Sequence, residues 1–125
     1  MLVQRLSLNG AVWSNVATDG DDIIDLGPGD DTFDALAGND TITGGTGAEK
    51  LYGEAGNDSL VGGAGDDTLS GGTGSDTLDG GVGTGDVAEL IGNFAEYTVT
   101  RPNATDIVLT GNAGTAVAGQ VVTLR

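Results

Sequence analysis

Hydrophobic and polar positions recur along the chain with a period of nine residues between positions 17 and 88. This region divides without a gap into eight nonapeptides, which read ATDGDDIID, LGPGDDTFD, ALAGNDTIT, GGTGAEKLY, GEAGNDSLV, GGAGDDTLS, GGTGSDTLD and GGVGTGDVA. Gly stands at the fourth position of every repeat, an acid at the sixth position of seven, and an apolar residue at the eighth position of all. A short period of this kind predicts a solenoid, in which each repeat buries its apolar face against its neighbours.

Each position of the repeat has a physical role. Gly at positions one, two and four permits positive φ, so the first six residues are expected to curl into a turn. Positions seven to nine are expected to form a short strand, whose middle residue faces inward while its neighbours face outward. One coil therefore takes two repeats, with turns on opposite edges of an all-β parallel roll. The inward residues are expected to be Ile24, Phe33, Ile42, Leu51, Leu60, Leu69, Leu78 and Val87.

The acids at the sixth position fall into two columns, because turns that stack on one edge belong to alternate repeats. Adjacent coils lie about 4.8 Å apart, and carboxylates stacked that closely repel one another. A calcium ion takes six or more oxygens at about 2.3 to 2.6 Å, so calcium in each gap would turn the repulsion into attraction. The first column consists of Asp22, Asp40, Asp58 and Asp76, and the second consists of Asp31, Glu49 and Asp67.

Composition supports a metal-dependent fold. The chain has 125 residues, of which 24 are Gly and few are aromatic, and its formal net charge is -15. Residues 17 to 88 hold sixteen of the nineteen acids and one of the four bases. Acidic, aromatic-poor chains tend to stay disordered because self-repulsion opposes compaction, so polyvalent cations are the expected remedy. We expect residues 17 to 88 to be largely disordered without calcium.

Several function classes are excluded by the same composition. The chain has no Cys and no His, so thiolate chemistry and the commonest general base are absent, and no catalytic constellation indicates an enzyme. Four basic residues are too few for a nucleic-acid partner. No apolar stretch is long enough to span a bilayer, and residues 1 to 16 lack the pattern of a signal peptide.

The repeats resemble the repeats-in-toxin (RTX) proteins, whose consensus is Gly-Gly-x-Gly-x-Asp-x-apolar-x, a calcium-binding repeat. GGAGDDTLS and GGTGSDTLD match this consensus at every position. The resemblance implies a right-handed parallel β-roll with one calcium between each pair of same-edge turns. It also implies that the Asp carboxylates bind together with carbonyl oxygens of the second and fourth residues. Those residues are Gly27, Gly45, Gly63 and Gly72 at the second position, and Gly20, Gly29, Gly38, Gly47, Gly56, Gly65 and Gly74 at the fourth.

Two departures from the consensus are expected to weaken particular sites. Glu49 replaces Asp, and its extra methylene displaces the carboxylate while Lys50 brings a competing cation. Gly85 is inserted in the last repeat and is expected to put Asp86 out of register. The three gaps of the first column are intact, so we expect three good sites with one to three more beside them, or about three to six calcium ions.

The flanking segments are expected to cap the roll, because solenoids must hide an apolar end and an open sheet edge. Residues 1 to 16 are interpreted as an N-terminal cap strand and residues 17 to 88 as the roll. Residues 89 to 125 contain three β-rich runs, AEYTVTR, TDIVLT and QVVTLR, which predict a small antiparallel cap. The chain ends within such a run, which suggests a fragment of a longer protein.

Together these features predict a non-catalytic calcium-binding module that folds on binding calcium. The family resemblance implies a larger bacterial protein exported by type I secretion, so the module is expected to be extracellular and monomeric. The alternative is an adhesive or polysaccharide-binding module, similar to those of calcium-dependent alginate epimerases. For that alternative, the candidate contacts with a polysaccharide are Trp13, Lys50 and Tyr52.

Overall fold

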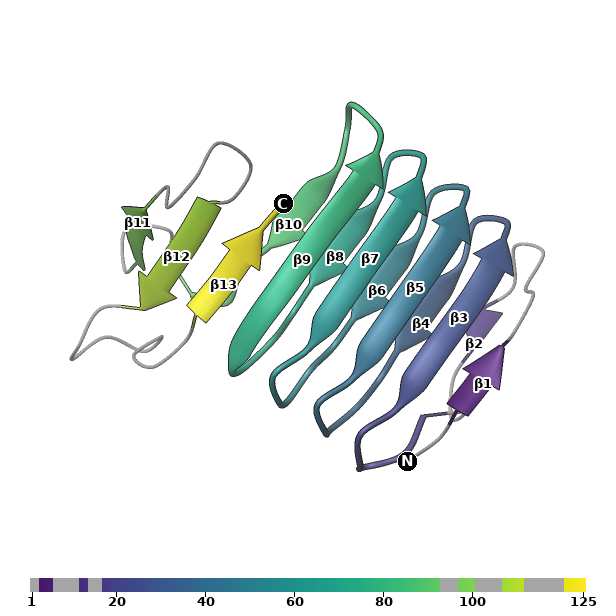
Figure 1. The fold of residues 1–125 in the computed structure, drawn as a ribbon, viewed down its shortest axis with the longest axis horizontal. Coiled ribbons are helices and arrows are strands. Elements are labelled where there is room, and N and C mark those ends of the chain that lie inside the picture. Colours follow the sequence, from purple (N-terminus) through teal and green to yellow (C-terminus); the bar gives the residue numbers. More distant parts are fainter. Residues whose placement is uncertain (1–2, 6–11, 14–16, 93–96, 101–106, 112–120) are drawn as a thin grey trace.

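The computed structural model describes residues 3–5, 12–13, 17–92, 97–100, 107–111 and 121–125. The regular secondary structure of these residues consists of β-strands. The strands form two sheets, which are the two layers of a parallel solenoid of about four turns (Figure 1). The parallel β-roll expected from the nine-residue period is confirmed.

The larger sheet contains eight strands in the order β1-β3-β5-β7-β9-β13-β12-β11. Strands β3, β5, β7 and β9 come from alternate repeats and pair in parallel with a shift of 18 residues, so that Ile24, Ile42, Leu60 and Leu78 form one row. One coil is therefore two repeats long. The strands are β1 (Val3–Arg5), β3 (Ile23–Pro28), β5 (Thr41–Thr46), β7 (Ser59–Ala64), β9 (Ser75–Val82), β11 (Tyr97–Thr100), β12 (Ile107–Gly111) and β13 (Val121–Leu124).

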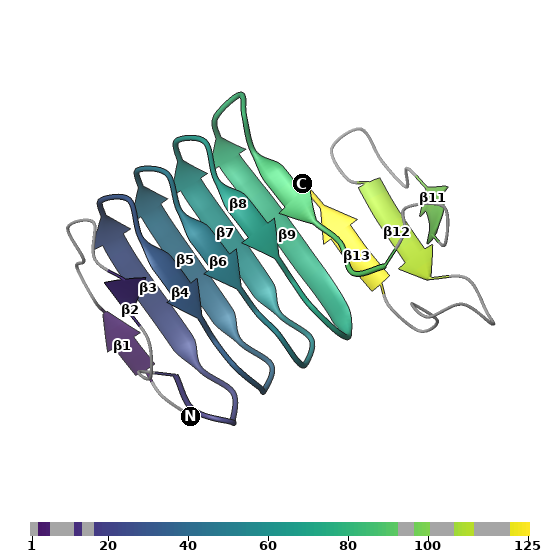
Figure 2. The same cartoon turned by 180° about the vertical axis from the view of Figure 1, so that it is seen from behind.

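The smaller sheet contains five strands in the order β10-β8-β6-β4-β2 and forms the other layer, which Figure 2 shows from behind. Phe33, Leu51 and Leu69 lie beside one another in it, again 18 residues apart. The strands are β2 (Val12–Trp13), β4 (Thr32–Asp34), β6 (Lys50–Tyr52), β8 (Thr68–Ser70) and β10 (Val87–Glu89).

Strand length differs between the two sheets, which the repeat did not predict. β4, β6 and β8 have the three residues expected, but β3, β5 and β7 have six. In β3 both Ile24 and Leu26 are buried, so the alternation of inward and outward residues continues into the first position of the next repeat. The extra inward position gives the larger sheet two rows of inward residues.

The core is one layer of apolar side chains that both sheets contribute between them. Seven of the eight residues expected to face inward are at most 2 % exposed. Leu26 and Ala35 at first positions join them, as do Leu109 and Val122 from the C-terminal strands. Burying a Leu or Ile side chain stabilises a fold by roughly 1.5 to 3 kcal/mol, so this core is modest for a chain of this size.

Val87, the eighth inward candidate, is an exception, because 51 % of it is exposed. Val87 pairs with Thr68 and Ala88 pairs with Leu69, so the inserted Gly85 has moved the strand by one position. A one-residue slip turns each side chain to the other face. The expectation that Val87 belongs to the core is therefore wrong.

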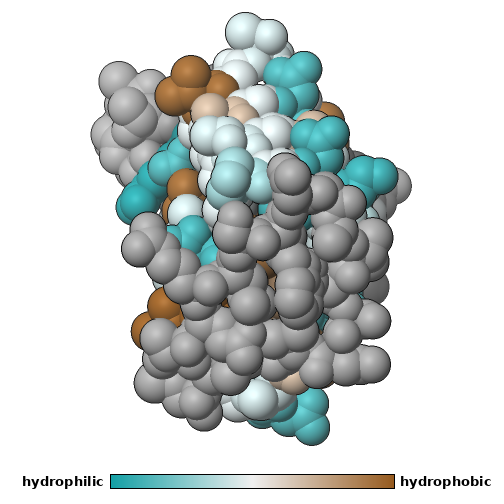
Figure 3. All heavy atoms as spheres, turned by 90° about the vertical axis from the view of Figure 1, so that its right-hand side faces the viewer, coloured by the Kyte–Doolittle hydropathy of each residue, from teal (hydrophilic) through white to brown (hydrophobic). Residues whose placement is uncertain are grey.

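The flanking strands extend both sheets. β1 pairs with β3 and β2 with β4, both in parallel, and most of residues 1 to 16 lies outside the described part of the chain. β11, β12 and β13 pair antiparallel as expected, and β13 also pairs in parallel with β9, where Leu124 lies beside Leu78. The boundaries at 16/17 and 88/89 remain predictions. From the N-terminal end of the roll, hydrophilic residues lie along the margins of the visible surface (Figure 3).

Candidate metal centres along two acid columns

From the third repeat onward, the turns approach each other so closely that only Gly fits at the fourth position. A Cβ placed on Gly56 would overlap the carbonyl oxygen of Gly38 in the preceding coil, and a Cβ on Gly65 would overlap that of Gly47. Gly56 also has φ of 142°, in the left-handed region that side chains disfavour. The fourth-position carbonyl therefore points along the roll axis toward the next coil.

Gly at the first position was expected to supply positive φ, but it instead leaves space for a carboxylate. A Cβ on Gly53 would overlap the Oδ2 atom of Asp58, and one on Gly71 would overlap that of Asp76. Positive φ occurs at second and fourth positions but not at Gly53 or Gly71. The first-position Gly thus makes room for the carboxylate of its own repeat.

The first acid column is assembled as predicted. The N–H of Asp22 donates to Oδ1 of Asp40 at 2.7 Å, the N–H of Asp40 to Oδ1 of Asp58 at 2.9 Å, and the N–H of Asp58 to Oδ1 of Asp76 at 3.0 Å. All four acids are at most 2 % exposed. The carboxylates of Asp40, Asp58 and Asp76 therefore reach back toward the preceding coil on the same edge.

At the start of this column, Asp22 has a local partner. Its carboxylate accepts bonds from the N–H of Thr18 at 2.7 Å and from the Thr18 hydroxyl at 3.0 Å. Thr18 stands at the second position of the first repeat, so it caps the column where no earlier acid turn exists. The sequence offered this signal as a Thr in a position otherwise dominated by Gly.

The second acid column has one more member than predicted. The N–H of Glu49 donates to Oδ1 of Asp67 at 2.9 Å, and the N–H of Asp67 donates to Oδ1 of Asp86 at 3.0 Å. Asp31 and Glu49 are each 1 % exposed and Asp67 is fully buried. The expectation that Gly85 puts Asp86 out of register is wrong in space, because the insertion lengthens the turn and Asp86 returns to the column.

Burial leaves several carboxylate oxygens without a hydrogen-bond donor. These are Oδ2 of Asp40, Asp58, Asp67 and Asp76, together with both carboxylate oxygens of Glu49. A buried charged oxygen without a partner is costly, because it has lost its water and gained nothing in return. A cation is the partner that such oxygens lack.

The pKa values of these acids show the same cost. Burial raises the pKa of Asp40 and of Asp58, the backbone hydrogen bonds lower it and the charges of neighbouring acids raise it, so that the net pKa of each is about 6. Burial also raises the pKa of Asp76. Burial and the adjacent Asp67 raise the pKa of Glu49 to about 8.

The gaps between turns contain the donors that calcium prefers. In the gap between the turns of Asp40 and Asp58, the carbonyl of Gly38 points forward from one coil and the carboxylate of Asp58 reaches back from the next. Both are hard oxygen donors, the kind that calcium selects. No group of three or more His, Cys, Asp or Glu side chains gathers at one point in the part of the chain described. A site here therefore needs backbone carbonyls, and the residues present fit calcium on those terms.

Sequence reasoning missed two further features of the turns. Exposed side chains at the fifth position, including Asp21 and Asn39, accept backbone N–H groups of the next coil. Leu36 and Glu54 have φ of 75° and 73° at the second position, where Gly usually stands. Both features occur at positions that the repeat consensus leaves variable or that these repeats depart from.

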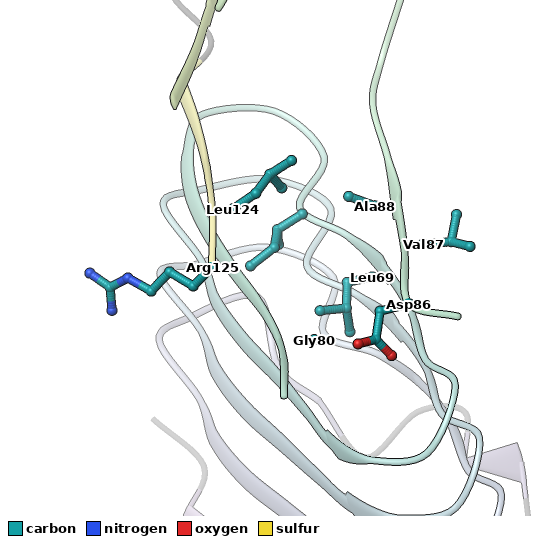
Figure 4. Close-up of a pocket in the computed structure, with 8 residues that line it drawn as sticks. Leu69, Gly80, Asp86, Val87, Ala88, Leu124 and Arg125 are labelled. Carbon is teal, nitrogen blue, oxygen red and sulfur yellow. The ribbon is translucent and has the colours of Figure 1, made fainter. Parts of the chain in front are cut away.

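A cavity of about 190 Å³ lies at the C-terminal end of the roll (Figure 4). Leu69, Leu78 and Leu124 line it, and the carboxylate of Asp86 points toward Gly80 on one side. Asp86, the last acid of its column in the described part of the chain, thus lines the cavity while its carboxylate reaches back to Asp67. Arg125 also belongs to the lining, but its guanidinium points away from Asp86.

The residues named for polysaccharide contact are only partly placed. Lys50 and Tyr52 occupy the two outward positions of β6, on either side of the buried Leu51. The side chain of Trp13 lies outside the described part of the structure. In the described residues, no helix is long and apolar enough to cross a membrane.

Comparison with known proteins identifies the repeats. A family model described as the RTX calcium-binding nonapeptide repeat (4 copies) matches residues 16–48, 25–60 and 52–87, which span more than half of the chain. A search of curated proteins found no match.

Proposed function

Because the chain belongs to the RTX calcium-binding nonapeptide repeat family, we propose that its two acid columns hold calcium ions between successive turns and that the roll folds when they bind. The observation that carries this proposal is the set of buried carboxylate oxygens without a donor, on turns whose fourth-position carbonyls point toward the next coil. Bound calcium would supply the positive charge that the columns lack.

The proposed ligands are the carboxylates of both columns and the carbonyl oxygens of the second and fourth positions. Three gaps lie in the first column and three in the second once Asp86 is included, so three to six ions remain the expected number. Glu49 borders two of the three gaps in the second column. We expect those two to be the weakest.

The proposed setting is extracellular, as a non-catalytic part of a larger secreted protein. Sites built largely of neutral carbonyls resemble those of extracellular modules, whose dissociation constants are about 10⁻⁴ to 10⁻³ M. Cytosolic calcium would leave such sites empty. Each site at ten times its dissociation constant adds about 1.4 kcal/mol, so five sites would add about 7 kcal/mol, which is enough to fold a marginal domain.

One titration tests this proposal. Far-ultraviolet circular dichroism is followed as calcium, and separately magnesium, is added to the chelated protein at fixed ionic strength, with calorimetry to count the ions. We expect a cooperative gain of β signal near millimolar calcium and little response to magnesium, which demands octahedral geometry and gives up water reluctantly. Full β signal in excess chelator, or an equal response to both ions, would contradict the proposal.

A further inference from the structure

A second hydrogen-bond ladder runs along the edge of the first acid column, through exposed side chains at the fifth position. The N–H of Asn39 donates to Oδ1 of Asp21 at 2.8 Å, and the N–H of Asn57 donates to Oδ1 of Asn39 at 2.9 Å. The N–H of Ser75 then donates to Oδ1 of Asn57 at 2.8 Å. Every N–H in this ladder points back to the preceding coil.

The opposite edge repeats the arrangement. The N–H of Ala48 donates to Oδ1 of Asp30 at 2.9 Å, and the N–H of Gly85 donates to Oδ1 of Asp66 at 3.1 Å. Asp66 also accepts the N–H of Thr84 at 3.4 Å, so it holds both residues beside the insertion. The ladder therefore runs beside both acid columns, but on this edge it is interrupted at Ala48, whose side chain has no acceptor for the N–H of Asp66.

The direction of these bonds orients the fourth-position carbonyls. In a planar trans peptide, the C=O of one residue and the N–H of the next point in opposite directions. Because the N–H of Asn57 points back to Asn39, the carbonyl of Gly56 must point forward. It does so, since a Cβ on Gly74 in the next coil would overlap the Gly56 oxygen.

We infer that the fifth-position side chains are positioning residues, which aim the fourth-position carbonyls into the calcium gaps through the peptide that joins positions four and five. Asn39 aims the carbonyl of Gly56 into the gap between the turns of Asp58 and Asp76. Asp21 and Asp30 do the same for Gly38 and Gly47. This inference rests on the proposed function, because it concerns ligands of the proposed ions.

The chain contains a matched control for Asn39. Asn57 accepts the same kind of bond, but the peptide it holds is that of Gly74 and Ser75. The Gly74 carbonyl accepts the N–H of Val121 at 3.0 Å, so it faces β13, which carries none of the acids of either column. Asn39 and Asn57 are both exposed, so neither Ala replacement leaves a buried cavity.

The test compares Asn39→Ala, Asn57→Ala and Asn39→Asp by calcium titration with dichroism and calorimetry. Loss of one hydrogen bond that aims a ligand should raise the calcium midpoint of Asn39→Ala about two- to tenfold above that of Asn57→Ala. The number of ions should not change, since the side chain is not itself a ligand. Asn39→Asp should keep the wild-type calcium midpoint, because an Asp carboxylate accepts the same hydrogen bond at the equivalent positions of other repeats.

Equal calcium midpoints for the two Ala variants would overturn the inference. So would the loss of an ion from Asn39→Ala, or a calcium midpoint of Asn39→Asp that lies above that of wild type. Asn39→Ser provides a second variant in case Asn39→Ala does not fold. Its hydroxyl is a shorter acceptor, so its midpoint should lie above that of wild type, and a wild-type value would overturn the inference. A wild-type chain that takes up no calcium would overturn the proposed function and this inference together.

Discussion

Replacing Asp58 by Asn should stabilise the chelated roll and weaken its response to calcium, two effects of opposite sign. Asn keeps an oxygen that can accept the N–H of Asp40, which Oδ1 of Asp58 accepts at 2.9 Å. Its amide N–H groups would face a column of acceptors, where Oδ2 of Asp58 now has no donor. The substitution removes one negative charge and leaves the shape of the turn.

The magnitude follows from the pKa of Asp58, which burial raises from 3.8 to about 6. One pKa unit corresponds to about 1.4 kcal/mol, so charging Asp58 costs the folded state about 3 kcal/mol above pH 6. That cost is a large part of the 5 to 15 kcal/mol by which proteins are stable. In calcium the same carboxylate is proposed to border two gaps, so its loss should raise the calcium midpoint.

The pH dependence has a definite sign. Because the folded pKa of Asp58 lies above its unfolded value, the folded state is favoured fully below pH 3.8 and that advantage is lost as the pH rises through about 6. The chelated wild type should therefore gain β signal as the pH falls from 8 to 4. The benefit of Asp58→Asn should shrink over the same range, because both side chains are then neutral.

The assay is far-ultraviolet dichroism in chelator and across a calcium titration, with Asp79→Asn as a control of equal charge change outside both columns. We expect Asp58→Asn alone to gain β signal in chelator and to need more calcium at the midpoint. A loss of β signal in chelator, or the same result from both variants, would refute the account of the column given above.

Three further predictions concern the turns and the second column. Gly65→Ala should abolish calcium-dependent β signal, because its Cβ would overlap the Gly47 carbonyl. Gly20→Ala should be tolerated, since among the described residues its Cβ would meet only a Thr18 oxygen, at 3.8 Å. Glu54→Gly should raise the thermal midpoint by relieving φ of 73°, a gain of roughly 0.5 to 1 kcal/mol after the entropy of Gly. Glu49→Asp should lower the calcium midpoint, and Glu49→Ala should cost less affinity than Asp58→Ala in matched calorimetric titrations.

The period of the sequence was enough to predict the coil and the first acid column. A nine-residue repeat with one apolar and one acidic position defines which residues stack, because an 18-residue coil brings Asp22, Asp40 and Asp58 to one edge. The pairing of β13 with β9 could not be predicted in this way. It joins residues far apart in sequence, and no repeat relates them.

The separate roles of the Gly residues within the turns could not be predicted from the sequence either. The repeat shows that Gly is needed, but Gly can be required for two different physical reasons. Gly53 makes room for a carboxylate, whereas Gly56 combines positive φ with close approach to Gly38. Only the structure separates these roles, and the difference predicts which substitutions a repeat tolerates.

The last repeat shows which of the two periodic features sets the register. After the insertion of Gly85, the chain could keep Val87 inside and leave the acid displaced, or keep the acid and expose Val87. It keeps the acid, since Oδ1 of Asp86 accepts the N–H of Asp67 at 3.0 Å while Val87 is 51 % exposed. Burial of a Val side chain is worth roughly 1.5 to 3 kcal/mol, so the ladder of polar contacts outweighs it at this edge. The acid column therefore sets the register of the final coil, and the exposure of Val87 is the consequence.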